Sequence, residues 1–122
     1  MKELLELKMP LESGLMTTAR LTAGGVCSLL GLDLDESEDC KVCLTESLLL
    51  LRHAGFCEAA VHFSEDNGLN IRIAGVGTAQ AAEEHAEDEI SYALLGALND
   101  TVVTHRQDGK LYEITFRVAR KA

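Results

Sequence analysis

The pattern of apolar and polar positions predicts about five strands and three helices. A first strand is expected over residues 4–9, before Pro10 interrupts the regular structure. Alternation of apolar with polar or small residues then predicts two hairpins, with turns at Asn67-Gly68 and Asp108-Gly109. The residues expected on the buried faces of these hairpins are Cys57, Ala59, Val61, Phe63, Leu69, Ile71, Ile73, Tyr112, Ile114, Phe116 and Val118.

Apolar residues that recur about every 3.6 positions predict the helices. The first is expected over residues 15–30. The second should begin after Asp33 or Asp35, either of which can cap it, and should end near Gly55. The third is expected over residues 79–98, acidic in its first half and apolar in its second. The apolar stripe of the first helix is expected to contain Leu15, Ala19, Val26, Leu29 and Leu30.

This order of elements predicts an α/β chain of the α+β type. Strands in hairpins with no repeating βαβ order favour a two-layer sandwich, in which three helices cover one face of a mixed, mainly antiparallel sheet. With 122 residues, 47% of them hydrophobic, the chain can bury a core of its own. We expect residues 1–122 to form a single domain, because no linker or repeat interrupts them.

Composition narrows the classes of function. A formal net charge of −9 and the lack of a Lys or Arg cluster argue against direct nucleic-acid binding. No apolar run approaches the roughly 20 residues that span a bilayer, and the N-terminal sequence lacks the apolar core of a signal peptide. We therefore expect no membrane association and a cytoplasmic location.

Cys40 and Cys43 form a CxxC pair, which leaves a redox or zinc role open. The pair lies in a helix-patterned segment, and no second CxxC or His pair completes a zinc site, so packing in the core is the favoured interpretation. The same interpretation is given to the other two cysteines. The four histidines fall on different predicted elements, and no metal site is expected. The other two cysteines are Cys27 and Cys57, and the four histidines are His53, His62, His85 and His105.

Two segments carry a resemblance to a known family. They are residues 35–56, DESEDCKVCLTESLLLLRHAGF, and residues 91–118, SYALLGALNDTVVTHRQDGKLYEITFRV. In order and spacing they resemble the serine-kinase anti-sigma factors, bacterial switch proteins built on the histidine-kinase-type ATPase domain. The resemblance runs from about Thr18 to the C-terminus and implies the histidine-kinase-type ATPase fold.

The resemblance places an ATP site at Glu46, Leu50, Gly75 and Gly77. The helix of the family carries Glu-x-x-x-Asn, in which the carboxylate acts as a base and the amide oxygen holds Mg²⁺. Glu46 is kept, but Leu50 offers no oxygen to a hard cation. The Asp-x-Gly turn of the family, which reads adenine, has Gly75 or Ala74 in place of its aspartate and keeps Gly77. Two alternatives remain open. Glu46 can be a structural carboxylate tied to His53 or to backbone, and Gly75 and Gly77 can form a simple turn.

The phosphate-binding elements of the family are also altered. Counting back from Asp100, the Gly-Leu-Gly of the family falls on residues 89–91, which read Glu-Ile-Ser. The acidic residues between positions 83 and 89 would repel a polyphosphate, where backbone N–H groups normally attract it. Eleven residues separate Gly77 from Glu89, which leaves little room for a nucleotide lid.

The resemblance thus implies an anti-sigma-factor-like regulatory protein with a degenerate, non-functional ATP site and no expected cofactor. It would act in bacterial transcription or stress regulation by binding a sigma factor or an antagonist of the anti-sigma factor. Arg20 and Thr22 match the partner-binding region, although Arg20 can equally be an ordinary solvated side chain. A homodimer is expected. The alternatives are an active ATP-dependent protein serine kinase using ATP, Mg²⁺ and Glu46 as catalytic base, a redox or metal protein, and a sensor of another small ligand.

Overall fold

A computed structural model describes residues 1–99 and 101–119. These residues form five strands and three helices. Asp100, from which the phosphate motif was counted back, lies outside the described residues. The elements are β1 (Lys2–Pro10), α1 (Ser13–Leu29), α2 (Leu34–His53), β2 (Glu58–Glu65), β3 (Gly68–Val76), α3 (Glu87–Leu98), β4 (Thr101–Gln107) and β5 (Lys110–Ala119).

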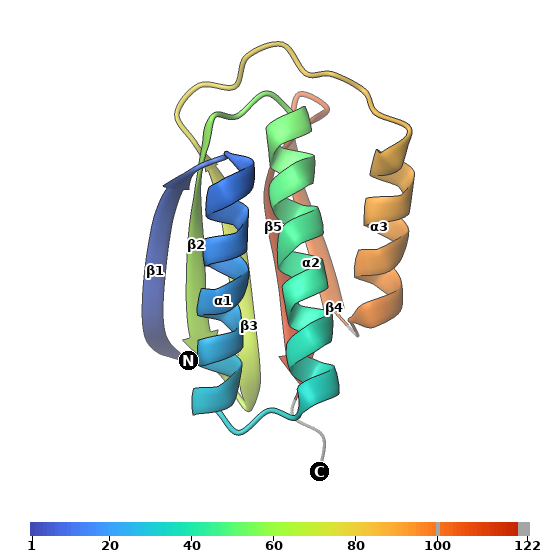
Figure 1. The fold of residues 1–122 in the computed structure, drawn as a ribbon. Helices are drawn as coiled ribbons and strands as arrows, with labels where there is room; N and C mark the ends of the chain where they lie inside the picture. The colour runs from blue at the N-terminus through green and yellow to red at the C-terminus, as the bar shows by residue number, and fades with distance from the viewer. Residues whose placement is uncertain (100, 120–122) are drawn as a thin grey trace.

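The strands form one sheet in the order β1-β2-β3-β5-β4, and the three helices lie side by side on one of its faces (Figure 1). The expected α+β class and two-layer arrangement are confirmed. The expectation of a mixed sheet is wrong, because all four described pairs of neighbouring strands are antiparallel. Between β1 and β2 the chain passes through α1 and α2, which run antiparallel to each other (Figure 1). Strand β2 therefore enters the sheet antiparallel to β1.

Both predicted hairpin turns are confirmed. Asp108 and Gly109 connect β4 to β5 with φ values of 53° and 78°. Positive φ at both positions matches the twist of the flanking strands, which is why Asp-Gly favours this turn. Asn67, with φ of 53°, precedes Gly68 at the turn between β2 and β3.

Helix α2 has the start and the stop that its sequence predicts, and Asp33 is the residue that caps it. The Asp33 carboxylate accepts a hydrogen bond from Glu36 N–H at 2.7 Å, and the Glu36 carboxylate accepts one from Asp33 N–H at 2.7 Å. This reciprocal pair satisfies two amides at the helix start. The helix ends at His53, and Gly55 follows with φ of 105°.

The helices and the sheet enclose one hydrophobic core. On α1 the buried residues differ in part from the expected stripe, because Leu29 is 78% exposed at the last position of the helix and Leu15 and Leu30 are half-buried. Three helices contribute residues to the core, and α2 contributes the most. The buried residues of α1 are Met16, Ala19, Ala23, Val26 and Cys27.

Two residues expected on buried strand faces are exposed. His105 pairs with Glu113 and Arg106 with Leu111, so Tyr112 is an extra residue in β5, a β-bulge. The bulge turns Tyr112 outward, 39% exposed, and places Leu111 in the core at 4%. Cys57 is also exposed, because β2 begins only at Glu58.

The third helix begins at Glu87 rather than at residue 79. The amides of Gln80 and Glu83 donate to the carbonyls of Gly55 and His53, each at 2.9 Å. These bonds tie residues 78–86 across the end of α2, so the amides are not available for a helix of their own. None of the helices in the described part of the chain is both long and apolar enough to cross a membrane.

The capping box gives a direct test of the start of α2. Asp33→Ala should lower the free energy of unfolding by about 1 kcal/mol, because the Glu36 amide loses its partner. Asp33→Asn should remain close to the original protein, since asparagine also caps. The matched control is Asp35→Ala, which removes an acidic residue of the same helical turn but no cap and should cost only a few tenths of a kcal/mol. Urea unfolding measures all three, and equal losses at Asp33 and Asp35 would contradict the assigned cap.

Candidate functional site

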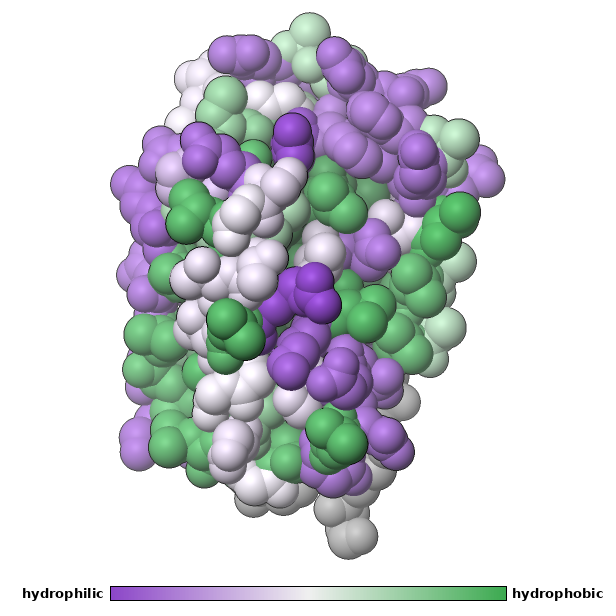
Figure 2. Space-filling model, viewed as in Figure 1, coloured by the Kyte–Doolittle hydropathy of each residue, from purple (hydrophilic) through white to green (hydrophobic). Residues whose placement is uncertain are grey.

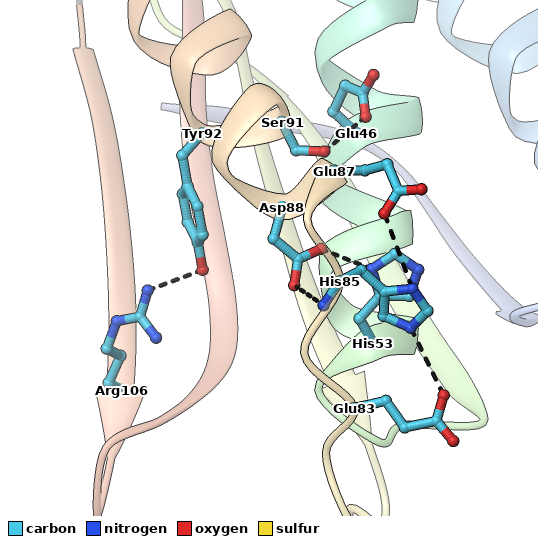
Figure 3. Close-up of polar contacts among 9 residues, drawn as sticks. All are labelled: Glu46, His53, Glu83, His85, Glu87, Asp88, Ser91, Tyr92 and Arg106. Atoms are coloured by element: carbon cyan, nitrogen blue, oxygen red, sulfur yellow. Dashed lines mark hydrogen bonds and ion pairs between the residues drawn. The ribbon is translucent and has the colours of Figure 1, made fainter.

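Three polar contacts join α2 to the neighbouring helix α3 and to Asn99, the residue that follows it, and two of them are drawn in Figure 3. Ser91 Oγ donates to Glu46 Oε2 at 2.8 Å, and His53 Nδ1 lies 2.6 Å from Asp88 Oδ1. The third contact runs from Asn99 Nδ2 to Cys43 Sγ at 2.9 Å. Along α2 the partners follow one another in reverse order on α3, so the two helices run antiparallel.

A histidine pair lies where residues 78–86 cross the end of α2. The rings of His53 and His85 are stacked, with centroids 3.7 Å apart and an interplanar angle of 16° (Figure 3). Carboxylates surround the pair: Glu83 lies 3.5 Å from His85 Nε2, and Glu87 lies 4.0 Å from its Nδ1. His53 is in the last turn of α2 and Asp88 in the first turn of α3, where the helix dipoles favour a basic and an acidic group respectively.

Leu50 lies one turn after Glu46 and is only 3% exposed. It borders a cleft of about 400 Å³, which Tyr92, Arg106 and Lys110 also line. Arg106 Nη2 donates to Tyr92 Oη at 2.7 Å, and its guanidinium carbon lies 5.5 Å from the centre of the tyrosine ring. Glu46 is on the same helix face, as the i, i+4 spacing predicts, but it contacts Ser91 and does not line this cleft.

Gly75 and Gly77 lie in a neighbouring cleft of about 440 Å³, which shares Lys110 and Leu111 with the first. The ring of Phe56 covers Gly75, where a Cβ would lie 2.5 Å from ring atoms. Gly77 has φ of 82° and directly follows β3. The two glycines thus serve a close approach and a turn, which supports the structural interpretation of both.

The buried cysteines Cys27, Cys40 and Cys43 have no exposed surface, which confirms the expectation of core packing for these three and not for Cys57. The hydrogen bond between the thiols of Cys27 and Cys40 raises the pKa of Cys40, as does its burial, and lowers the pKa of Cys27. Burial raises the pKa of Cys43 to about 11 despite the hydrogen bond from Asn99. Among residues 1–99 and 101–119, no group of three or more His, Cys, Asp or Glu side chains is arranged to hold a metal ion.

Arg20 and Thr22 lie on α1, away from the clefts that contain the other site residues. Helix α2 stands between α1 and α3 (Figure 1). Arg20 is exposed, and its neighbour Leu21 is 70% exposed. Thr22 is half-buried and its hydroxyl donates to the Thr18 carbonyl at 2.9 Å, one helical turn back.

Sequence reasoning found the helix face but not its partners. The suggestion that Glu46 is tied to His53 is wrong, since Ser91 holds Glu46 and Asp88 holds His53. Ser91 falls at the third residue of the altered Gly-Leu-Gly, inside α3 rather than at its start. The stacking of His53 on His85 was not predicted at all. The sequence signal for it was faint: a basic end of one helix and an acidic start of the next.

No protein-family model matches this chain, and no curated protein shows significant sequence similarity to it.

The cysteines differ in accessibility and in pKa, and this can be tested chemically. With iodoacetamide at about pH 8, the folded protein should gain one adduct, at the exposed Cys57, because thiol reactivity requires access and deprotonation. Burial protects Cys27, Cys40 and Cys43, and a raised pKa additionally protects Cys40 and Cys43. Intact-mass analysis should show four adducts after unfolding in urea. Rapid alkylation of Cys27 or Cys40 in the folded protein would contradict the packing of α1 on α2.

The contact between Phe56 and Gly75 gives a second test. Gly75→Ala should lower the free energy of unfolding by about 1–3 kcal/mol, because the added Cβ meets the ring of Phe56. The same change at Gly96, an exposed position of α3 with open space around it, should instead stabilise the protein by up to about 1 kcal/mol. In a Phe56→Ala background, Gly75→Ala should cost almost nothing. An equal cost in both backgrounds, measured by urea unfolding, would rule out the ring as the cause.

Proposed function

We propose that this chain is an anti-sigma-factor-like regulatory protein that acts by binding other proteins and no longer turns over ATP. The proposal includes the histidine-kinase-type ATPase fold and a role in bacterial transcription or stress regulation in the cytoplasm. The arrangement of helices on one face of the sheet is compatible with that fold. The observation that carries the proposal is the state of the Glu46 carboxylate.

Glu46 accepts the hydroxyl hydrogen bond of Ser91 at 2.8 Å, so its carboxylate is engaged by α3 rather than directed at a substrate. A general base must lie within reach of the proton that it removes. Leu50, one turn on, is buried among apolar side chains and offers no oxygen for Mg²⁺. These two positions together support loss of the catalytic step.

The charges around the first cleft also disfavour a nucleotide. Glu83, Glu84, Asp88 and Glu89 line it, against two cationic side chains, Arg106 and Lys110. A triphosphate placed there would face four carboxylates, and the phosphate-binding role of a free helix N-terminus is opposed by the acidic first turn of α3.

The adenine side of the family site is also occupied. The ring of Phe56 lies over Gly75, so an aspartate side chain at this position would collide with it. Restoring Leu50→Asn and Gly75→Asp would therefore not be sufficient to rebuild the site, because Phe56 would have to move as well.

A surface for a protein partner is available on α1. Arg20 is exposed and stands beside Leu21, a large apolar side chain that is 70% exposed. Arginine is enriched among the residues that contribute most of the binding energy in protein interfaces. We therefore propose Arg20 as a contact for a sigma factor or an antagonist of the anti-sigma factor. Thr22, whose hydroxyl is bonded within α1, would contribute through its position rather than through that donor. A homodimer is part of the same proposal.

Calorimetry with ATP or ADP, with and without Mg²⁺, tests the loss of nucleotide turnover. We expect no heat of binding up to millimolar nucleotide, because the carboxylate, the metal position and the adenine position are all unsuitable. Micromolar, Mg²⁺-dependent binding would overturn this part of the proposal and support the alternative of an active ATP-dependent protein serine kinase.

Pairwise binding to purified sigma factors and anti-sigma antagonists of the same organism tests the partner. We expect one of them to bind, and Arg20→Glu to weaken that complex by about tenfold or more, as for an interface arginine. The matched control is Arg52→Glu, which reverses the charge of an exposed arginine on a different helix, α2. No binding to any of these proteins, or equal losses in both variants, would argue against the proposed role of α1.

A further inference from the structure

Helix α3 has an apolar face that the core does not use. Its buried residues are Ser91 and Leu95, which are 4% and 1% exposed. Ile90, by contrast, is 62% exposed at the fourth position of the helix. The unburied apolar residues recur at i, i+3, i+4 and i+7, the spacing of a helix face that packs on another helix. They are Ile90, Ala93, Leu94 and Ala97.

The neighbouring side of α2 continues this surface. The bond between Glu46 and Ser91 defines the line along which the two helices meet. On α2, Cys43 and Leu50 lie on the core side of that line, with 0% and 3% exposure. Val42, which is 38% exposed, lies on its solvent side, and the half-buried Leu49, which also packs against the core, borders it. Figure 2 shows hydrophobic surface gathered over α3 and reaching toward α2 on the face that the helices present. We call this surface the α2–α3 seam, made of Val42, Leu49, Ile90, Leu94 and Ala97.

The two ends of the seam are acidic, although α2 also carries two cations, Lys41, which pairs with Glu38 at 3.2 Å, and Arg52 in its last turn. Asp35 and Asp39 belong to the first turns of α2, at one end of the seam, and Glu87 and Glu89 to the first turn of α3, at the other end. Helix α3 contains no lysine, arginine or histidine between Glu87 and Leu98. An apolar stripe with acidic residues at both ends is complementary to an apolar stripe flanked by cations.

We propose that the α2–α3 seam binds an amphipathic α-helix of a partner protein, one whose apolar stripe is flanked by lysine or arginine. The partner helix lies along the seam, with its apolar residues between Val42 and Ile90 and its cations toward the acidic ends. This inference goes beyond the proposed function: it concerns the opposite side of α2 from Arg20 and does not involve the nucleotide site.

Two other occupants fit the charges poorly. A second copy of the chain bound through the same seam would bring acidic ends against acidic ends, in whichever direction the two copies run. An anionic membrane surface would likewise repel the carboxylates. Charge complementarity therefore favours a basic partner helix over both.

A model peptide tests the seam without knowledge of the natural partner. The probe is a fluorescein-labelled peptide of about 14 leucines and lysines, with the leucines on one helical face. Fluorescence anisotropy should show binding, and Ile90→Asp and Val42→Asp, one change from each helix, should each weaken it by about tenfold. The matched controls are Leu29→Asp on α1 and Leu5→Asp on β1, at leucines 78% and 41% exposed but outside the seam, and should leave it unchanged. Circular dichroism confirms that each variant is folded.

Peptide controls separate this seam from general attraction to an acidic protein. A peptide with glutamate in place of lysine, and one of the same composition without helical spacing of the leucines, should both bind at least tenfold more weakly. Equal binding of either peptide, or equal losses in seam and control variants, would overturn the proposal. So would a dimer, seen by sedimentation, that Ile90→Asp dissociates, or association with anionic vesicles that Ile90→Asp abolishes.

Discussion

The close contact between Gly55 and Gln80 determines how the second half of the chain is placed on the first. Gly55 follows the end of α2 with φ of 105°, a conformation that favours glycine, and a Cβ there would collide with the Gln80 carbonyl. The Gly55 carbonyl in turn accepts the Gln80 amide at 2.9 Å. This contact brings residues 78–86 across the end of α2, where His85 stacks on His53. It also places the first turn of α3 so that Asp88 contacts His53. The candidate site thus follows from a turn at which only glycine fits.

The parts of the fold that depend on local chemistry could be predicted from the sequence. The cap at Asp33, the stop at Gly55 and the Asp108-Gly109 turn each use residues that are adjacent or one turn apart. The start of α3 could not be predicted, because the Gln80 and Glu83 amides bond to carbonyls about 25 to 30 positions earlier in the chain. The buried face of β5 was misplaced at Tyr112, since a single bulged residue reverses the alternation on which such predictions rest.

The candidate site was predictable as a helix face and not as a set of contacts. The spacing of Glu46 and Leu50 places them on one side of α2, and that holds. The partner of Glu46 is Ser91, 45 residues away, and nothing in the local pattern indicates it. In the same way, Gly75 must be small because the ring of Phe56, which follows α2, packs against it. Side chains that meet only after the elements pack are therefore the ones that sequence reasoning missed.

The three polar contacts between α2 and α3 have a mechanical consequence. They lie at different heights, at Cys43, Glu46 and His53 of α2. The hydrophobic effect is non-directional and does not by itself select one axial position of α3. A slide by one helical turn, about 5.4 Å, would instead break all three contacts together. Helix α3 therefore has a single axial register on α2. Its exposed residues are consequently held at fixed positions along α2 for any binding partner.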